Sequence, residues 1–241
     1  MTMSIDEKQQ KALRTAGLLY LLMAITAPFG LLYVPGKLIV PGDATATADH
    51  IRASEWLLRL GIGSELFHQA IAVFLVMALY RLFKAVNENQ AKLLMILGCL
   101  VSVPIMFLNV LNEIAALVLV SGADFLSVFD KRQLDALAYL FLRLHGQGIV
   151  VASIFWGLWL FPFGILVVRS GFIPRIFGIL LFIAGAGYLA NSFTSLILPH
   201  YEQLVGQVAL ILEVAEVPII FWLFFRGLWP AGRTGPDRAG S

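Results

Sequence analysis

The chain has 241 residues, of which 59% are hydrophobic and 13% charged, and its formal net charge at pH 7 is +2. An average soluble domain is about half apolar and about a quarter charged, and a small globule keeps much of its surface in water. This composition argues against a soluble enzyme, a secreted disulfide scaffold and a disordered chain. The absence of a long basic run argues against nucleic acid as a partner. An integral membrane protein remains.

Six apolar runs are long enough to cross a bilayer as helices, which takes about 20 residues each. The alternating segments of about ten residues that form transmembrane β-barrels are absent. The sequence therefore predicts an all-α integral membrane protein in a lipid bilayer. Its predicted transmembrane helices lie at about 16–34, 60–80, 93–120, 146–168, 176–198 and 204–225.

The first and third connections between these helices are long and carry helix-start signals. In residues 35–59, turn-forming Pro and Gly residues precede Asp43, and we expect a short polar helix from about residue 45 that runs into the second span. In residues 121–143, Asp130 followed by Gln133 fits a capping box. Both connections are therefore expected to contain helix before the chain enters the membrane.

The second and fourth connections are short, so the helices that they join should be antiparallel neighbours. In the fifth predicted span, Gly178, Gly185 and Gly187 would allow a neighbouring helix to approach closely. The Pro/Gly-rich residues 230–241 are predicted to be a disordered tail after one membrane domain of residues 1–229.

Lys and Arg are unevenly divided between the two ends of the predicted helices. Eleven of the 17 lie on the side of both termini, and the other six lie on the side of the two long connections. Positive residues accumulate on the cytoplasmic side of membrane proteins. We therefore expect cytoplasmic termini and three hairpins that open outward.

Polar side chains in helices two to six concentrate at or outside the predicted centre of the membrane. A charged side chain there costs at least a few kcal/mol, which makes it a functional candidate. We predict that these groups face one another around a wet cavity open to the extracytoplasmic side, because lipid cannot satisfy their hydrogen bonds. The alternative is that they only bond neighbouring helices together. The candidate ligand-binding residues are Glu65, Gln69, Asn109, Asn112, Glu113, His145, Asn191, Glu213 and Glu216.

A metal ion is one alternative occupant of this cavity. Glu65 and His68 place two possible ligands on one helical face, as in di-metal sites of helix bundles, although the second Glu-x-x-His pair of such sites is missing. The lone Cys99 excludes c-type haem attachment, and no lysine lies inside a span to hold retinal. The cofactor stays unknown. The candidate metal ligands are Glu65, His68, Glu113, His145, Glu213 and Glu216.

Several short motifs carry a resemblance to a known family. They are LLYVPGKLIVPG at 31–42, SGAD at 121–124, HGQG at 145–148 with FWGLWL at 155–160 and Pro162, and SGFIPRIFG at 170–178. With them the chain resembles, from about Ala12 to Gly227, the bacterial multi-pass membrane family catalogued as domain of unknown function 4386. The resemblance implies a bacterial inner-membrane protein with one membrane domain, and it implies no activity. His68 falls outside the family's pattern, which weakens the metal hypothesis.

Three functions fit these observations. The first is binding or transport of a small polar or cationic ligand in the outer cavity. The second is a membrane-embedded, metal-dependent hydrolase that uses Glu or His as a base. The third is a structural or accessory protein whose polar groups hold its helices together. The ligand, the partners and the oligomeric state are not determined by the sequence.

Overall fold

The computed structural model describes residues 7–228, apart from the side chain of Lys8, and the predicted tail at 230–241 lies outside the described residues. The described chain is helical and contains six stretches long and apolar enough to cross a membrane, which confirms the predicted all-α class. These stretches are Gln9–Leu38, Glu55–Phe83, Glu88–Val120, Lys131–Ser170, Arg175–Ile197 and Pro199–Leu228.

Three of the six spans are single helices and three are interrupted. The continuous ones are α4 (Glu55–Phe83), α7 (Lys131–Ser170) and α8 (Arg175–Ile197). The interrupted ones are α1 (Glu7–Pro28), η1 (Phe29–Tyr33) and α2 (Val34–Leu38); α5 (Glu88–Met95), η2 (Ile96–Val101) and α6 (Ser102–Val120); and η4 (Pro199–Tyr201), α9 (Glu202–Glu213), η5 (Val214–Glu216) and α10 (Val217–Leu228). The two long connections, which we call the outer connections whichever side of the membrane they face, add α3 (Ala44–Ala53) and η3 (Asp124–Leu126).

Proline explains where the interruptions fall. A proline has no N–H to bond the carbonyl four residues earlier, so the regular α-helical pattern fails there. The two π-helical segments, η1 and η2, and the 3₁₀ segment η5 each contain the residue four positions before a proline. These pairs are Leu31 with Pro35, Leu100 with Pro104, and Val214 with Pro218. Pro28 and Pro162 are exceptions, because the residues four positions before them lie in regular α-helix in α1 and α7.

Local capping sets the ends of the outer helices as the sequence predicts. The Asp43 side chain accepts a hydrogen bond from the backbone N–H of Ala46 at 2.9 Å, and Asp130 and Gln133 form a complete capping box at the start of α7. One detail of the prediction is wrong. The outer polar helix does not run into the second span, because α3 ends at Ala53 and Ser54 adopts non-helical angles (φ −136°, ψ 44°).

The short connections also end in defined caps. Asn87 accepts a hydrogen bond from the backbone N–H of Gln90 at 3.0 Å and starts α5. Gly171 follows α7 with a φ of 72°, a left-handed conformation that favours glycine and lets the chain reverse into α8. The close approach predicted for the fifth span is confirmed, because a Cβ on Gly178 would lie 2.7 Å from the Gly164 carbonyl oxygen of α7.

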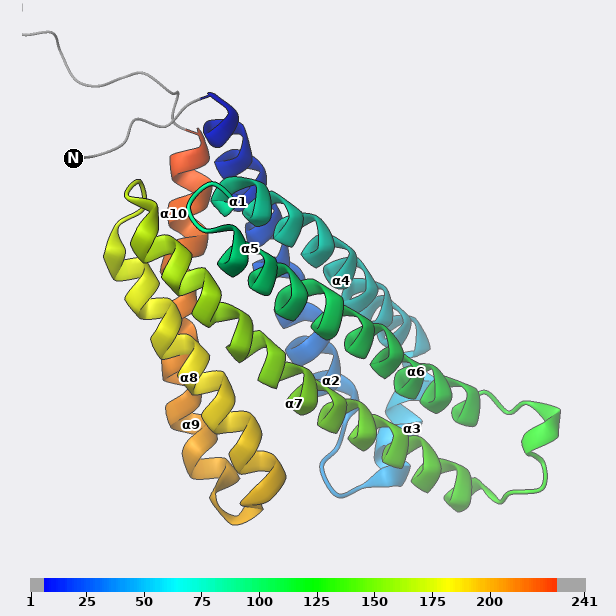
Figure 1. Ribbon diagram of the computed structural model, residues 1–241. Coiled ribbons are helices and arrows are strands. Elements are labelled where there is room, and N and C mark those ends of the chain that lie inside the picture. Colours follow the sequence, from blue (N-terminus) through cyan, green and yellow to red (C-terminus); the bar gives the residue numbers. More distant parts are fainter. Residues whose placement is uncertain (1–6, 229–241) are drawn as a thin grey trace, which may run out of the picture.

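The helices form one elongated bundle (Figure 1). α7 packs between α6 and α8, and α1 packs against both α4 and α10. The start of α1, the end of α10, and the α4–α5 and α7–α8 links lie at one end of the bundle, and the other connections lie toward the opposite end. This arrangement gives three hairpins, but their orientation in the membrane stays a prediction.

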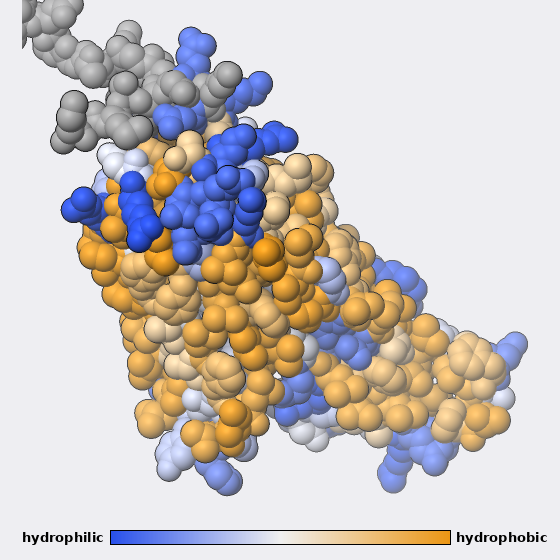
Figure 2. Space-filling view, in the orientation of Figure 1, coloured by the Kyte–Doolittle hydropathy of each residue, from blue (hydrophilic) through white to orange (hydrophobic). Residues whose placement is uncertain are grey.

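Figure 2 shows hydrophobic residues over most of the bundle's length and hydrophilic residues gathered toward its ends. Large apolar side chains such as Leu108 and Ile211 are 67% and 73% exposed. An apolar belt of this extent would be unfavourable in water and suits a bilayer. The protein is therefore a multi-pass membrane protein in a lipid environment, although which membrane holds it stays a prediction.

Two apolar cores stabilise the bundle. One includes Leu75, Leu79 and Phe163, and the other includes Ile51 and Val110 beside the outer connections. Along α4, Glu65 and Gln69 follow residues of the second core and precede residues of the first core. Along α7, His145 also follows residues of the second core and precedes residues of the first. Glu65, Gln69 and His145 therefore lie in a polar layer between two separately packed apolar regions.

Candidate functional site

The structure brings three predicted residues from three helices together in the bundle interior. Glu65 of α4, Glu113 of α6 and His145 of α7 form what we call the carboxylate–histidine cluster. The His145 Nε2 atom lies 3.1 Å from Glu65 Oε2 and 3.9 Å from Glu113 Oε2. All three side chains are buried, with exposed fractions of 2%, 2% and 5%.

Two oxygen atoms of this cluster have no hydrogen-bond partner among the described residues. They are Glu65 Oε1 and Glu113 Oε2. Buried polar atoms are nearly always paired in folded proteins, because an unpaired one loses its hydration without replacement. In this cluster, buried carboxylate oxygens of the described interior therefore lack the hydrogen bonds that would replace their lost hydration.

Neighbouring polar residues and glycines fix the position of the cluster. The Asn109 amide donates to the His145 carbonyl oxygen at 2.9 Å, and the Asn112 amide donates to the Asn109 side-chain oxygen at 3.1 Å. A Cβ on Gly148 would lie 2.0 Å from Asn109 Oδ1, and one on Gly30 would lie 2.9 Å from Glu65 Cγ. These two glycines leave the space that Asn109 and Glu65 occupy.

A small cavity of about 20 Å³ borders the cluster beneath the outer connection. Glu113 and His145 are its polar lining residues, and the others are apolar or proline residues that include Val34, Ile51 and Leu142. The cavity is large enough for a single water molecule.

A larger cavity of about 320 Å³ lies elsewhere in the bundle, and we call it the aromatic–carboxylate cavity. Residues from all six spans line it. Its aromatic and polar lining residues are Tyr20, His68, Gln69, Ser102, Trp156, Trp159, Tyr188, Glu213 and Glu216. No Lys or Arg is among its described lining residues.

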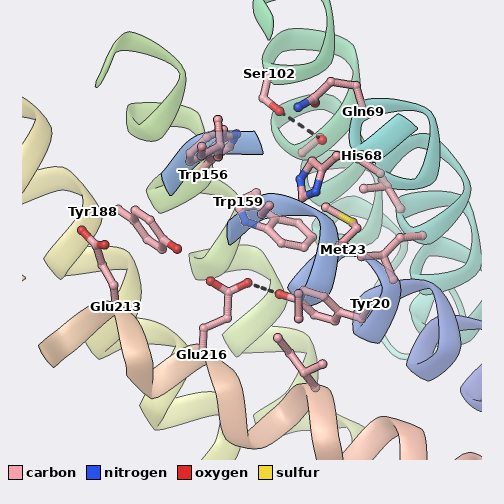
Figure 3. Close-up of a pocket in the computed structure, with 18 of the residues that line it drawn as sticks. Tyr20, Met23, His68, Gln69, Ser102, Trp156, Trp159, Tyr188, Glu213 and Glu216 are labelled. Carbon is pink, nitrogen blue, oxygen red and sulfur yellow. Dashed lines mark hydrogen bonds between the residues drawn. The ribbon is translucent and has the colours of Figure 1, made fainter. Parts of the chain in front are cut away.

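The two carboxylates of this cavity are held by hydrogen bonds. The Tyr20 hydroxyl donates to Glu216 Oε1, and Tyr188 lies against the same carboxylate (Figure 3). The Asn191 amide donates to Glu213 Oε1 at 3.3 Å. Figure 3 shows the Glu216 carboxylate directed toward the same space as the Tyr20 and Trp159 rings.

The structure thus divides the predicted ligand-binding residues between two places. Glu65, Glu113 and His145 form the cluster, with Asn109 and Asn112 beside it, whereas Gln69, Glu213 and Glu216 line the larger cavity and Asn191 supports Glu213. Of the predicted metal ligands, His68 lines the cavity and its Nδ1 lies 3.1 Å from Thr26 Oγ1, so it is not part of the cluster.

Sequence reasoning did not select the aromatic residues of the larger cavity. Tyr20 lies in the predicted span 16–34, which has no charged residues, and Trp156 and Trp159 have the spacing of ordinary packing residues. Tyr188, three residues before Asn191 on the same helical face, was the one available signal.

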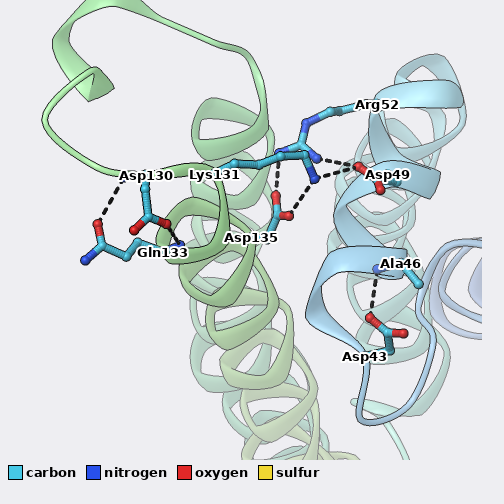
Figure 4. Close-up of polar contacts among 8 residues, drawn as sticks. All are labelled: Asp43, Ala46, Asp49, Arg52, Asp130, Lys131, Gln133 and Asp135. Carbon is cyan, nitrogen blue, oxygen red and sulfur yellow. Dashed lines mark hydrogen bonds and ion pairs between the residues drawn. The ribbon is translucent and has the colours of Figure 1, made fainter.

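A polar network that the sequence pattern did not predict joins α3 to α7 (Figure 4). The fully buried Asp135 forms ion pairs with Arg52 and with Lys131, whose Nζ lies 2.9 Å from Asp135 Oδ2 and 3.1 Å from Asp49 Oδ1. The hydrogen bond from Lys131 lowers the pKa of Asp49 below its usual range. This network holds α3, which belongs to the first long connection, against α7 at the end of the bundle that contains the small cavity.

Comparison with known proteins places the whole membrane domain in one family. An uncharacterized protein of Archaeoglobus fulgidus is 34% identical over 74 residues, which are 31% of this chain and 43% of that protein, so the chain spans less than half the length of this curated relative. No solved structure matches the chain. Residues 15–227 match the family described as "Domain of unknown function (DUF4386)". Because this match covers most of the chain and confirms the resemblance seen in its motifs, the protein belongs to that family.

Proposed function

We propose that the protein binds a small organic cation in the aromatic–carboxylate cavity and carries it through the membrane. The observation that supports binding is the lining of this cavity, in which Glu213 and Glu216 lie among four aromatic residues and no Lys or Arg is found among the described lining residues. A cation would balance the carboxylate charge in a region where charge is costly.

The aromatic residues suit an alkylated ammonium group in particular. Cations are attracted to the faces of Trp and Tyr rings within about 6 Å, and quaternary ammonium groups are recognised in this way. The Tyr20 and Trp159 ring centroids lie 6.0 Å apart, and the Trp156 and Tyr188 rings form a second pair at 6.4 Å. A volume of about 320 Å³ fits a compact ligand rather than a long chain.

The helix interruptions support the transport part of the proposal. Leu31 of η1, Gly98 of η2 and Glu216 of η5 all line the cavity, so each interruption contacts it. Membrane transporters commonly build their substrate sites from interrupted helices near the bilayer midplane, and short π or 3₁₀ segments often mark hinges.

A binding titration tests the proposal. We expect tetraethylammonium and choline to change the fluorescence of Trp156 and Trp159 in purified protein, and the neutral choline isostere 3,3-dimethylbutan-1-ol to have no such effect. Glu216→Gln should weaken cation binding at least tenfold, because it removes the charge and preserves the shape. Glu202→Gln, on the exposed face of the same span, is the matched control and should bind like the wild type.

The outcomes separate this proposal from its alternatives. Equal binding of choline and its neutral isostere, or unchanged cation affinity in Glu216→Gln, would contradict it. If Glu216 only holds helices together, Glu216→Gln should lower the unfolding temperature and leave the titration unchanged. Uptake of labelled choline into proteoliposomes that contain the wild type, but not Glu216→Gln, is the result expected for transport.

A further inference from the structure

The carboxylate–histidine cluster is absent from the lining of the larger cavity, and cation binding there makes no use of it. We propose that Glu65, Glu113 and His145 bind one divalent transition-metal ion, with Zn²⁺ as the best fit. The proposal is independent of the proposed function because the two sites share no residue.

The positions of the ligand atoms fit a single ion. Zn²⁺ binds His nitrogen and carboxylate oxygen at about 2.0–2.2 Å, so two ligand atoms of a tetrahedral site lie roughly 3.3 Å apart. The distances from His145 Nε2 to the nearest oxygens of Glu65 and Glu113 are 3.1 and 3.9 Å, on either side of that value. One such atom from each residue lies within 4.8 Å of the others.

The charge of the cluster also fits a divalent ion. Among the described residues, no Lys or Arg forms an ion pair with Glu65 or Glu113. Two carboxylates and a neutral imidazole around a divalent ion have no net charge, which removes the main cost of burying carboxylates. The oxygens Glu65 Oε1 and Glu113 Oε2, which accept no hydrogen bond among the described residues, are an independent sign that the cluster lacks a further partner.

The type of ligand favours zinc over magnesium or calcium. Imidazole together with carboxylates suits zinc and its neighbours, whereas Mg²⁺ and Ca²⁺ prefer six or more oxygen ligands. The small cavity beside Glu113 and His145 has room for a water molecule as the fourth ligand. Three protein ligands with one open position are the arrangement of zinc sites that activate water.

Metal content provides the direct test. Purified wild-type protein loaded with Zn²⁺ and desalted should retain one zinc per chain by elemental analysis. His145→Gln and Glu113→Gln should each weaken Zn²⁺ binding by more than the roughly 10- to 100-fold that loss of a supporting residue costs. The matched control is His68→Gln, a second histidine in the bundle interior that lies outside the cluster and should retain zinc.

A spectroscopic measurement keeps the test independent of stability. Co²⁺ loaded in place of Zn²⁺ should give the intense visible absorption of a four-coordinate site, and Glu65→Asp should alter this spectrum while the chain stays folded. Absence of zinc from folded wild type, or equal zinc loss in His68→Gln and His145→Gln, would overturn the proposal. Tetraethylammonium binding should persist in His145→Gln, so the two proposals can fail separately.

Discussion

Single atoms decide how closely the helices around the carboxylate–histidine cluster can approach. The sequence His145-Gly146-Gln147-Gly148 contains two glycines with different surroundings. A Cβ on Gly148 would overlap the Asn109 side chain, whereas a Cβ on Gly146 would meet nothing within 4 Å. The two positions therefore separate the packing effect of a methyl group from its general effect on a helix.

We predict that Gly148→Ala lowers stability and Gly146→Ala does not. Overpacking a tight contact costs about 1–3 kcal/mol, whereas Ala at an open helical position is favoured over Gly by about 1 kcal/mol. Thermal unfolding in detergent measures both effects, and Gly148→Ala should have the lower midpoint. Equal midpoints for the two variants would contradict the close contact at Asn109.

At the same scale, ion pairs stabilise the polar network that joins α3 to α7. Lys131 lowers the pKa of Asp49 in the folded protein, so these ion pairs stabilise the fold above the unfolded-state pKa of about 3.9. The contribution is lost as the pH falls through the lower, folded-state pKa. We predict that Asp49→Asn lowers the unfolding midpoint at pH 7 and has a much smaller effect at pH 3.

The control for this prediction is the same substitution in a Lys131→Met background. If Lys131 causes the shift, the pH dependence of the Asp49→Asn effect should largely disappear there. A pH dependence of unchanged size in the double variant would assign the pKa shift to other groups.

At the scale of elements, the proline positions organise the larger cavity. Pro218 lies four residues after Val214, and the 3₁₀ segment between α9 and α10 ends at Glu216, whose carboxylate faces the cavity. Pro162 lies inside α7 without an interruption. The interruption at η5 therefore contributes to where the Glu216 side chain points.

We predict that Pro218→Ala weakens tetraethylammonium binding by several-fold without lowering the unfolding midpoint. An alanine N–H can restore the regular α-helical bond, which would rotate Glu216 relative to Tyr20. Pro162→Ala serves as the control and should leave the affinity unchanged. Equal affinities in the wild type and Pro218→Ala would show that the segment does not orient Glu216.

At the scale of the whole molecule, hydropathy and helix-capping residues predicted the features of the fold that depend on local sequence. The six spans and the helix starts at Asp43 and Asp130 follow from apolar run length and side-chain hydrogen bonds to nearby backbone. The grouping of the polar residues could not be predicted in this way. Glu65 and His68 are three residues apart, yet Glu65 joins the cluster and His68 faces the cavity. Helix tilt and neighbouring helices determine that division, and neither is encoded in the local pattern.

The family of the chain supplies no activity, so the function rests on the two sites themselves. The hydrolase alternative would require the carboxylate–histidine cluster to hold a metal ion that activates water. The binding alternative requires only the larger cavity. The two sites share no residue and can be tested separately.

The difference between continuous and interrupted spans has a mechanical consequence. α4, α7 and α8 pass the level of the cavity without a break, whereas the other three spans each have a joint there. α4 and α8 can serve as a fixed frame, because bending either would disrupt an intact ladder of backbone hydrogen bonds, whereas α7 lacks one such bond at Pro162. We therefore expect any change in the shape of the cavity to come from movement of the three interrupted spans, which carry Tyr20 and Glu216.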